Sequence, residues 1–152
     1  MSLSWEKPAI EIRPYSGRPE LSRAHFATEK EMPDTLYTRL GGYDAIAAVA
    51  DDLLVRLRAD TQLARFWQHR AEDSISREKQ LLIDFLCASA GGPLYYTGRD
   101  MPTSHRGMGI SEVDWRQFIG HLEATLDNFK VPAAERTAVL GFIDGTKADI
   151  VE

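Results

Sequence analysis

The stretch Arg99-Asp100-Met101-Pro102-Thr103-Ser104-His105-Arg106-Gly107-Met108-Gly109-Ile110 separates two helical patterns in this chain of 152 residues. Before it, Gly91-Gly92-Pro93 is a strong signal for the end of a helix. After it, Ser111 and Asp114 have the spacing of a capping box, in which a hydroxyl is followed three residues later by a carboxylate. On such a short connecting segment, a lone histidine like His105 is more often structural or exposed than a ligand.

Outward from this stretch, apolar residues recur at steps of three and four, which is the period of an amphipathic helix. Four sizeable helices are predicted, at residues 44–57, 75–90, 111–127 and 132–151. A short helix at 35–40 precedes the pair Gly41-Gly42. No segment of the sequence alternates with period two between hairpin turns. The sequence therefore predicts an all-α fold whose helices enclose a core and have room for something larger.

The composition is typical of an ordinary globular domain, with 43% hydrophobic and 27% charged residues. The net charge of −5 has the wrong sign for a protein that chiefly neutralises nucleic-acid phosphates. The single cysteine, Cys87, cannot form an intrachain disulfide. Apolar runs are far shorter than the roughly 18–20 residues of a membrane span, and the N-terminus has no pattern of a secretory signal. We expect a cytoplasmic protein without nucleic-acid or membrane partners; its oligomeric state stays open.

The chain divides by composition into two parts. Residues 1–34 hold four of the seven prolines and have no apolar period, which predicts an irregular N-terminal arm. The helical patterns occupy residues 35–152, which predicts one helical domain. Neither part carries the His or Cys spacing of a zinc site, and Gly107-Met108-Gly109 follows no strand, as a phosphate-binding loop would.

Several motifs, in the right order, resemble truncated haemoglobins of group I. Leu36-Tyr37-Thr38-Arg39-Leu40-Gly41-Gly42 is similar to the family's opening signature. Gly91-Gly92-Pro93, then 96–101 and 105–110, resembles the segment from the distal helix to the proximal histidine, and Gly120-His121-Leu122 is similar to the next helix. The resemblance extends from about Thr35 to the C-terminus. It implies a two-over-two helical sandwich around haem, in which 44–57 crosses 75–90 and 111–127 crosses 132–151.

The resemblance implies haem b, iron protoporphyrin IX, as the cofactor, and matches His105 to the proximal iron ligand. It places Trp67 where the family has a Phe or Tyr packed on the porphyrin. Arg99 and Arg106 match partners of the haem propionates, with a solvated surface role as the alternative. It also surrounds the haem with apolar side chains, those of Phe85, Leu86, Met101, Met108, Ile110, Trp115, Phe118, Ile119 and Ile143.

On the distal side of the haem the chain departs from the family pattern. The family's tyrosine donor corresponds to Leu54, its glutamine to Leu82 and its gate residue to Glu78. A hydrogen bond to a charged partner contributes roughly 1.5–3 kcal/mol. Because the usual donors to the bound gas are missing, we expect weaker retention of O₂ than in relatives that have them.

Three side chains are candidates to replace the missing donors. Trp67 has an indole N–H, and Lys79 or Gln80 would reach the haem if the distal helix were rotated or slipped. The alternative is that residues 78–80 form an exposed face of that helix. His69 is a candidate for a sixth ligand of the iron.

The resemblance implies a haem protein that binds O₂, CO and NO, for oxygen carriage or NO detoxification. An NO dioxygenase activity would need an external reductase. Two alternatives stay open: a haem-based redox or sensor module with six-coordinate iron, bound through His69 or Lys79, and a haem-free, all-α interaction domain.

Overall fold

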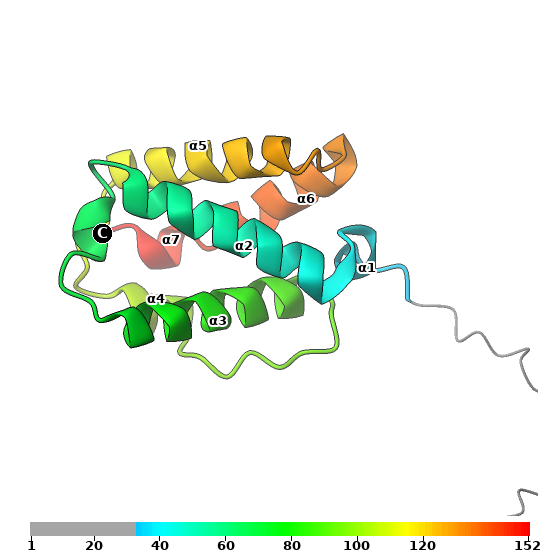
Figure 1. Ribbon diagram of the computed structural model, residues 1–152, viewed down its shortest axis with the longest axis horizontal. Coiled ribbons are helices and arrows are strands. Elements are labelled where there is room, and N and C mark those ends of the chain that lie inside the picture. Colours follow the sequence, from blue (N-terminus) through cyan, green and yellow to red (C-terminus); the bar gives the residue numbers. More distant parts are fainter. Residues whose placement is uncertain (1–32) are drawn as a thin grey trace, which may run out of the picture. The chain divides into compact units, whose positions relative to one another are not determined.

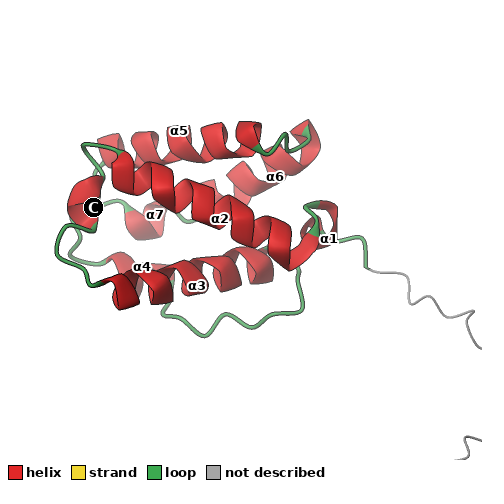
Figure 2. Cartoon of the chain, viewed as in Figure 1, coloured by secondary structure: helices red, strands yellow, loops and turns green. Residues whose placement is uncertain are grey.

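The computed structural model describes residues 33–152, so all but the last two residues of the predicted arm lie outside the described part. Between 33 and 152 the chain forms helices and no strand (Figures 1 and 2), which confirms the all-α prediction. None of these helices has the length and apolar character needed to cross a membrane. In chain order they are α1 (Leu36–Arg39), α2 (Gly42–Ala59), the 3-10 turn η2 (Ala64–Phe66), α3 (Glu72–Ser89), α4 (Met101–His105), α5 (Glu112–Asn128), α6 (Ala133–Asp144) and α7 (Lys147–Ile150).

Helix α2 lies at the centre of the arrangement, with α3 on one side and α5 on the other (Figure 1). Helix α6 follows α5 and runs back beneath it. The most deeply buried apolar side chains, among them Ala50, Leu53, Cys87 and Leu126, come from α2, α3 and α5. Burial of these surfaces stabilises the contacts between α2 and its two neighbours.

The start of α5 follows its sequence signal. The Asp114 N–H donates to Ser111 Oγ at 3.2 Å, and the Ser111 N–H donates to Asp114 Oδ2 at 2.9 Å. Each residue thus satisfies a backbone group of the other, and the predicted capping box is confirmed.

The predicted single helix at 132–151 is wrong, because the chain breaks it after Asp144 into α6 and α7. Gly145 is a weak helix former. The hydroxyl of Thr146 donates to the carbonyl of Ile143 at 2.6 Å, a local bond that competes with the helical pattern. The break turns α7 toward α4, against which it packs.

The motif at residues 36–42 lies against the glycine pair Gly91-Gly92 in the folded chain. The Tyr37 N–H donates to the carbonyl of Ala90 at 2.8 Å. A Cβ atom on Gly92 would lie 2.5 Å from the Tyr37 ring and 2.9 Å from the Cys87 carbonyl. Only glycine leaves room for the ring, so α1 is held against the end of α3.

Candidate functional site

One large cavity of about 760 Å³ opens among α2, α3, α4, α5 and the C-terminal segment. Its volume is in the range of pockets for cofactors and drug-sized ligands. Most of the residues that the sequence analysis assigned to a site line it: Leu54, Trp67, Glu78, Leu82, Phe85, Arg99, Met101, His105, Met108, Ile110, Trp115, Phe118 and Ile143.

Three assigned residues do not line this cavity. Leu86 is 8% exposed and belongs to the core, because it lies one position beyond Phe85 on another face of α3. Ile119 follows Phe118 on α5 and packs against the core in the same way. Arg106 lies just past the end of α4 and is exposed to solvent.

His105 is the last residue of α4 and lines the cavity, half-buried. Its Nδ1 atom lies 2.9 Å from the carbonyl oxygen of Met101, one turn earlier. A carbonyl can only accept, so Nδ1 carries the proton of this bond. The other nitrogen, Nε2, then has a free lone pair, which is the form in which a neutral histidine binds a metal.

Helix α4, which carries His105, is short and is fixed at its start by a side-chain cap. The carboxylate of Asp100 accepts from the Thr103 N–H at 2.8 Å, and Pro102 occupies the first turn, where its missing N–H costs nothing. Hydrogen bonds to Thr103 lower the pKa of Asp100, so this cap is ionised at neutral pH.

The α3 wall of the cavity changes from charged to apolar along the helix. Asp73 and Arg77 are exposed, whereas Leu82 and Phe85 are half-buried. The cavity therefore has a polar mouth near the start of α3 and an apolar interior toward its end. The lining residues of this wall follow at steps of three and four and so share one helix face: Asp73, Ser74, Arg77, Glu78, Leu81, Leu82 and Phe85.

Several arginines stand at the mouth. Arg70 donates to Glu78 Oε2 at 2.5 Å. Arg77 and Arg99 also line the cavity, and neither forms an ion pair with any residue from 33 to 152. Two guanidinium groups at the mouth thus remain available for an anionic group.

The apolar part of the wall includes Leu54, Leu81 and Leu82, whose side chains have no hydrogen-bond donor. Trp67 also lines the cavity, and its ring packs edge-on against Phe66 at 6.3 Å between centroids. The Trp67 Nε1–H is buried and has no partner within the described residues. A buried N–H without an acceptor costs about 1–3 kcal/mol, so Trp67 has an unmet hydrogen bond at this site.

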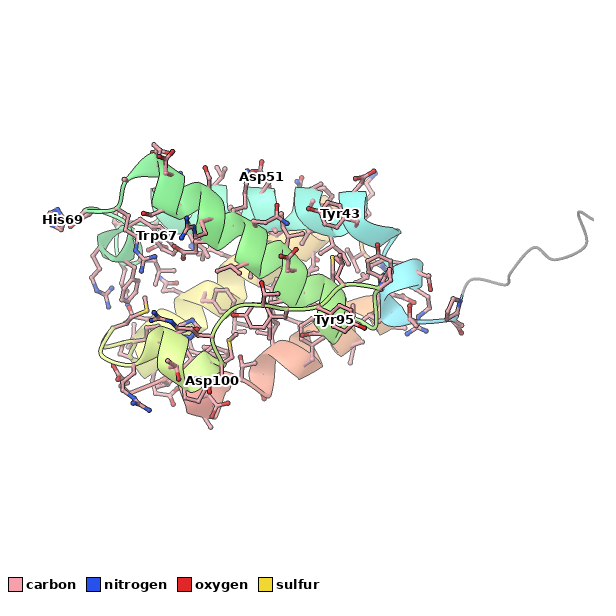
Figure 3. The ribbon with its side chains drawn as sticks, turned by 90° about the horizontal axis from the view of Figure 1, so that it is seen from below. Tyr43, Asp51, Trp67, His69, Tyr95 and Asp100 are labelled. Atoms are coloured by element: carbon pink, nitrogen blue, oxygen red, sulfur yellow. The ribbon has the colours of Figure 1, made fainter. Side chains whose placement is uncertain are left out.

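The other candidates for the distal side point elsewhere. Lys79 donates to Asp51 at 3.0 Å and Gln80 to the Tyr43 hydroxyl at 3.0 Å, both on the outer side of α2. His69 is exposed and projects away from the body of the molecule, as Figure 3 shows. None of Lys79, Gln80 and His69 lines the cavity.

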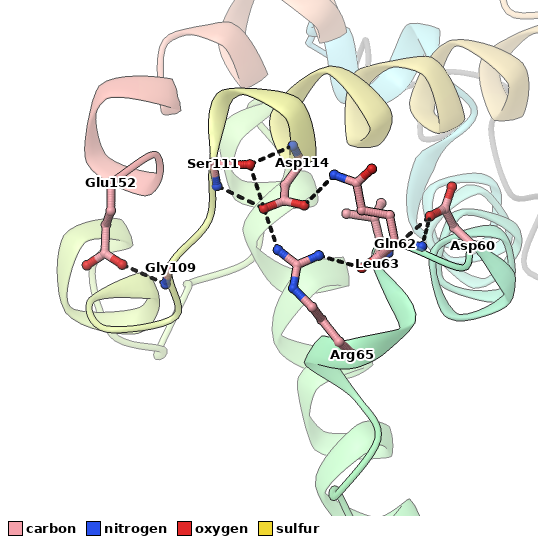
Figure 4. Close-up of polar contacts among 8 residues, drawn as sticks. All are labelled: Asp60, Gln62, Leu63, Arg65, Gly109, Ser111, Asp114 and Glu152. Carbon is pink, nitrogen blue, oxygen red and sulfur yellow. Dashed lines mark hydrogen bonds and ion pairs between the residues drawn. The ribbon is translucent and has the colours of Figure 1, made fainter.

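A buried polar cluster, which the sequence analysis did not find, supports the wall where α5 begins (Figure 4). Asp114 is 1% exposed, and its carboxylate accepts from Arg65 at 2.6 Å and from Gln62 at 2.8 Å, besides its bond to Ser111. The Arg65 guanidinium holds the pKa of Asp114 far below its usual range, against the opposing effect of burial. Gln62 and Arg65 are about 50 residues from Asp114 in sequence, a separation that no local pattern could bridge.

Comparison with known proteins now decides the family. A profile of the bacterial-like globins matches residues 35–152. The chain belongs to the bacterial-like globin family. Group 1 truncated hemoglobin GlbN of Mycolicibacterium paratuberculosis is 34% identical over 114 residues, which are 75% of this chain and 82% of that protein. The group 1 truncated hemoglobin of Tetrahymena pyriformis is 29% identical over 119 residues, 78% of this chain and 96% of that protein.

Solved structures of truncated haemoglobins share the fold of this globin. The Fe(III) form of the truncated hemoglobin from Tetrahymena pyriformis has a TM-score of 0.71 at 27% identity, over 77% of this chain and 97% of that one. Chlamydomonas reinhardtii THB1 has a TM-score of 0.67 at 26% identity, over 80% and 99%. The predicted truncated-haemoglobin family and two-over-two fold are confirmed. Membership of the globin family implies a haem cofactor and the binding of diatomic gases.

The cavity of this globin fits a haem by its own chemistry. Haem is a largely apolar plate with two carboxylates on one edge, and the cavity joins an apolar interior to a mouth that carries Arg77 and Arg99. His105 lines the cavity, and its Nε2 carries a lone pair of the kind that binds a metal. The residues that would hold the group are therefore His105 at the iron, the apolar wall along the plate and the arginines at its carboxylates.

Proposed function

We propose that this globin binds haem b through His105 and takes up O₂, CO and NO at ferrous iron, releasing O₂ faster than relatives with a distal tyrosine and glutamine. The observation that carries the proposal is the hydrogen bond between His105 Nδ1 and the Met101 carbonyl, which leaves Nε2 free beside a large apolar cavity. When bound, the haem supplies the iron at which gases bind.

The role of His105 follows from its fixed ring. A backbone carbonyl that accepts from Nδ1 sets the tautomer and restrains rotation of the imidazole. It also makes Nε2 a better electron donor, because the N–H···O bond shifts electron density into the ring. His105 is therefore already in the tautomer that binds iron.

The role of the distal wall is to exclude water without holding the gas by a strong hydrogen bond. Leu54, Leu81 and Leu82 supply only apolar contacts, and CO binding depends less on a donor than O₂ binding does. A donor to a partly charged ligand contributes roughly 1.5–3 kcal/mol, which is about one to two decades in affinity. The absence of a donor at Leu54 and Leu82, the positions that match the family's tyrosine and glutamine, supports fast release of O₂.

The role of the mouth is to orient the cofactor. Arg77 and Arg99 have planar guanidinium groups that suit carboxylates, and the opposite end of the cavity is apolar. A haem inserted with its propionates inward would bury two carboxylates against leucines and phenylalanine, at a cost of several kcal/mol for each. The charge distribution thus favours one direction of insertion.

The test is a set of visible spectra and one kinetic trace on the full chain. We expect a Soret band, a ferrous CO complex typical of a histidine-ligated haem, and O₂ release at least tenfold faster than in a truncated haemoglobin that has the distal tyrosine and glutamine, measured in parallel. His105→Gly should lose the haem and recover it when imidazole is added. His69→Ala is the matched control, because this histidine lies outside the cavity, and its spectrum should equal that of the wild type.

Each alternative has its own result. A colourless protein with no Soret band after addition of haem would establish the haem-free interaction domain. A six-coordinate ferric spectrum that is lost in His69→Ala or Lys79→Ala would establish the sensor module. Very slow O₂ release would show that a donor reaches the gas after all.

A further inference from the structure

We infer that Glu152 is a positioning residue for His105: its carboxylate holds the turn that follows the iron ligand. The inference rests on the proposed function, since it takes His105 as the ligand of the haem. Nothing in the resemblance to truncated haemoglobins assigns a role to this residue.

Both oxygens of the Glu152 carboxylate accept backbone N–H groups. Gly107 donates to Oε1 and Gly109 donates to Oε2, each at 2.7 Å (Figure 4 shows the second bond). The two glycines have φ angles of +78° and +65°, in the left-handed region. Both N–H groups converge on one anion, which is similar to the backbone nests that bind anions elsewhere. The turn is thus built around a negative charge, and Glu152 supplies it.

The main chain of Glu152 is fixed as well. Its N–H donates to the carbonyl of Ile110 at 2.9 Å. The side chain and the main chain of one residue therefore hold three successive parts of the segment 107–110. Helix α7, which precedes Glu152, packs against α4, so the whole C-terminal segment lies against the helix that carries His105.

With these bonds, every backbone N–H just after His105 has a partner. The Arg106 N–H donates to Pro102 and the Met108 N–H to His105 itself, at 3.0 and 3.1 Å. The N–H groups of Gly107 and Gly109 have Glu152 as their acceptor. Without it, both would turn to water, and the segment 107–110 would lose the side-chain bonds that tie it to the residue at the end of the C-terminal segment. The end of α4 would then move more freely, and the His105 ring would move with it.

The carboxylate is ionised where it acts. The N–H groups of Gly107 and Gly109 lower the pKa of Glu152, with a contribution from the nearby Arg106. Bonds to an ionised acceptor are roughly twice as strong as neutral ones. Glutamine at this position would keep the length of the side chain and lose the charge, and only one of its two polar atoms accepts a hydrogen bond.

The experiment compares Glu152→Gln and Glu152→Ala with Asp149→Asn in the full chain. Asp149 is the matched control: it is an exposed acid on α7, and its side chain makes no hydrogen bond within residues 33–152. Two readouts need haem, namely its rate of transfer to excess apomyoglobin and the iron–histidine stretching frequency of the ferrous form. The third, amide hydrogen exchange at Gly107 and Gly109, is measured on the protein as purified.

We expect Glu152→Ala to lose haem roughly tenfold faster, the lower end of what outer-shell partners of a metal ligand contribute. Its iron–histidine frequency should shift or broaden, a change that a general loss of stability would not produce. Exchange at Gly107 and Gly109 should accelerate, Glu152→Gln should be intermediate on every readout, and Asp149→Asn should equal the wild type.

Different results overturn the inference and the proposed function. The inference is wrong if exchange at Gly107 and Gly109 is the same in wild type and Glu152→Ala, or if Asp149→Asn changes haem loss as much. It is also wrong if haem loss and the stretching frequency are unchanged while His105→Gly loses the haem. If the wild type takes up no haem, the proposed function fails, and the exchange data still show whether Glu152 holds the turn.

Discussion

Replacing Asp114 should destabilise the fold more than replacing any exposed acid. The carboxylate is 1% exposed and accepts from Arg65, Gln62, and the N–H and hydroxyl of Ser111, all between 2.6 and 2.9 Å. Asp114→Ala removes the acceptor of all four hydrogen bonds at once. It also leaves the Gln62 amide facing a space that the carboxylate had filled.

The magnitude follows from the separate losses. Loss of the capping box costs about 1 kcal/mol, and a stranded polar partner costs about 1–3 kcal/mol. The Arg65 side chain is 43% exposed, so its charge returns to water and adds little. We expect a decrease of about 3 kcal/mol in the free energy of unfolding for Asp114→Ala, and about half of that for Asp114→Asn.

The effect should also depend on pH. Because the folded protein lowers the pKa of Asp114 below the ordinary value of 3.8, the ionised carboxylate stabilises the fold above about pH 4. That stabilisation is lost as the pH falls through the folded pKa. The difference in stability between wild type and Asp114→Asn should therefore be constant near neutrality and shrink below about pH 4.

The assay is urea unfolding followed by circular dichroism, with the haem content of the proteins matched, since a bound ligand adds to the apparent stability. Asp144→Asn serves as the control, because Asp144 is an exposed acid on α6. A loss below 1 kcal/mol for Asp114→Ala, or an equal loss for Asp144→Asn, would refute the argument. If the difference in unfolding free energy between wild type and Asp114→Asn increases as the pH falls, the sign of the predicted pH dependence is refuted.

Three further predictions concern the cavity and the glycines. Leu54→Tyr should slow O₂ release in stopped flow by about tenfold to a hundredfold, because it adds a donor to the distal wall; an unchanged rate would mean that residue 54 does not face the gas. Trp67→Phe should leave O₂ release within about twofold of the wild type, because the proposed function has no strong donor to the gas, and a faster release would identify Trp67 as the donor. Gly92→Ala should lower the free energy of unfolding by about 1–3 kcal/mol, because the added methyl group would clash with Tyr37. Gly120→Ala, at an open helix position, is the control and should raise the free energy of unfolding slightly. Equal effects of the two substitutions in urea unfolding would contradict the clash.

The main helices could be predicted from the sequence because their apolar faces repeat with a strong period. The start of α5 was visible in Ser111 and Asp114, whose side chains act within one turn. The break after Asp144 was missed because apolar residues continue with helical period to Ile150, and the bond from Thr146 to Ile143 competes with the helix without changing that pattern.

For the site, the sequence predicted only what the resemblance to truncated haemoglobins implies. It matched His105, and the structure places this histidine at the cavity. The supporting hydrogen bonds from the Gly107 N–H to Glu152 and from Gln62 to Asp114 span 45 and 52 residues. Such pairs depend on how helices pack, and no spacing within a short window encodes them.

The buried face of α3 has a consequence for the chemistry inside. An α-helix turns by about 100° for each residue, so the side chains that face the cavity depend on how α3 is rotated about its own axis. Ile83, Leu86 and Cys87 of α3 are buried in the core, and this packing fixes the angle at which α3 presents Leu81 and Leu82 to the cavity. A substitution in this buried face that rotates α3 would change which side chains line the cavity, and under the proposed function it would change gas release from a position that the gas never touches.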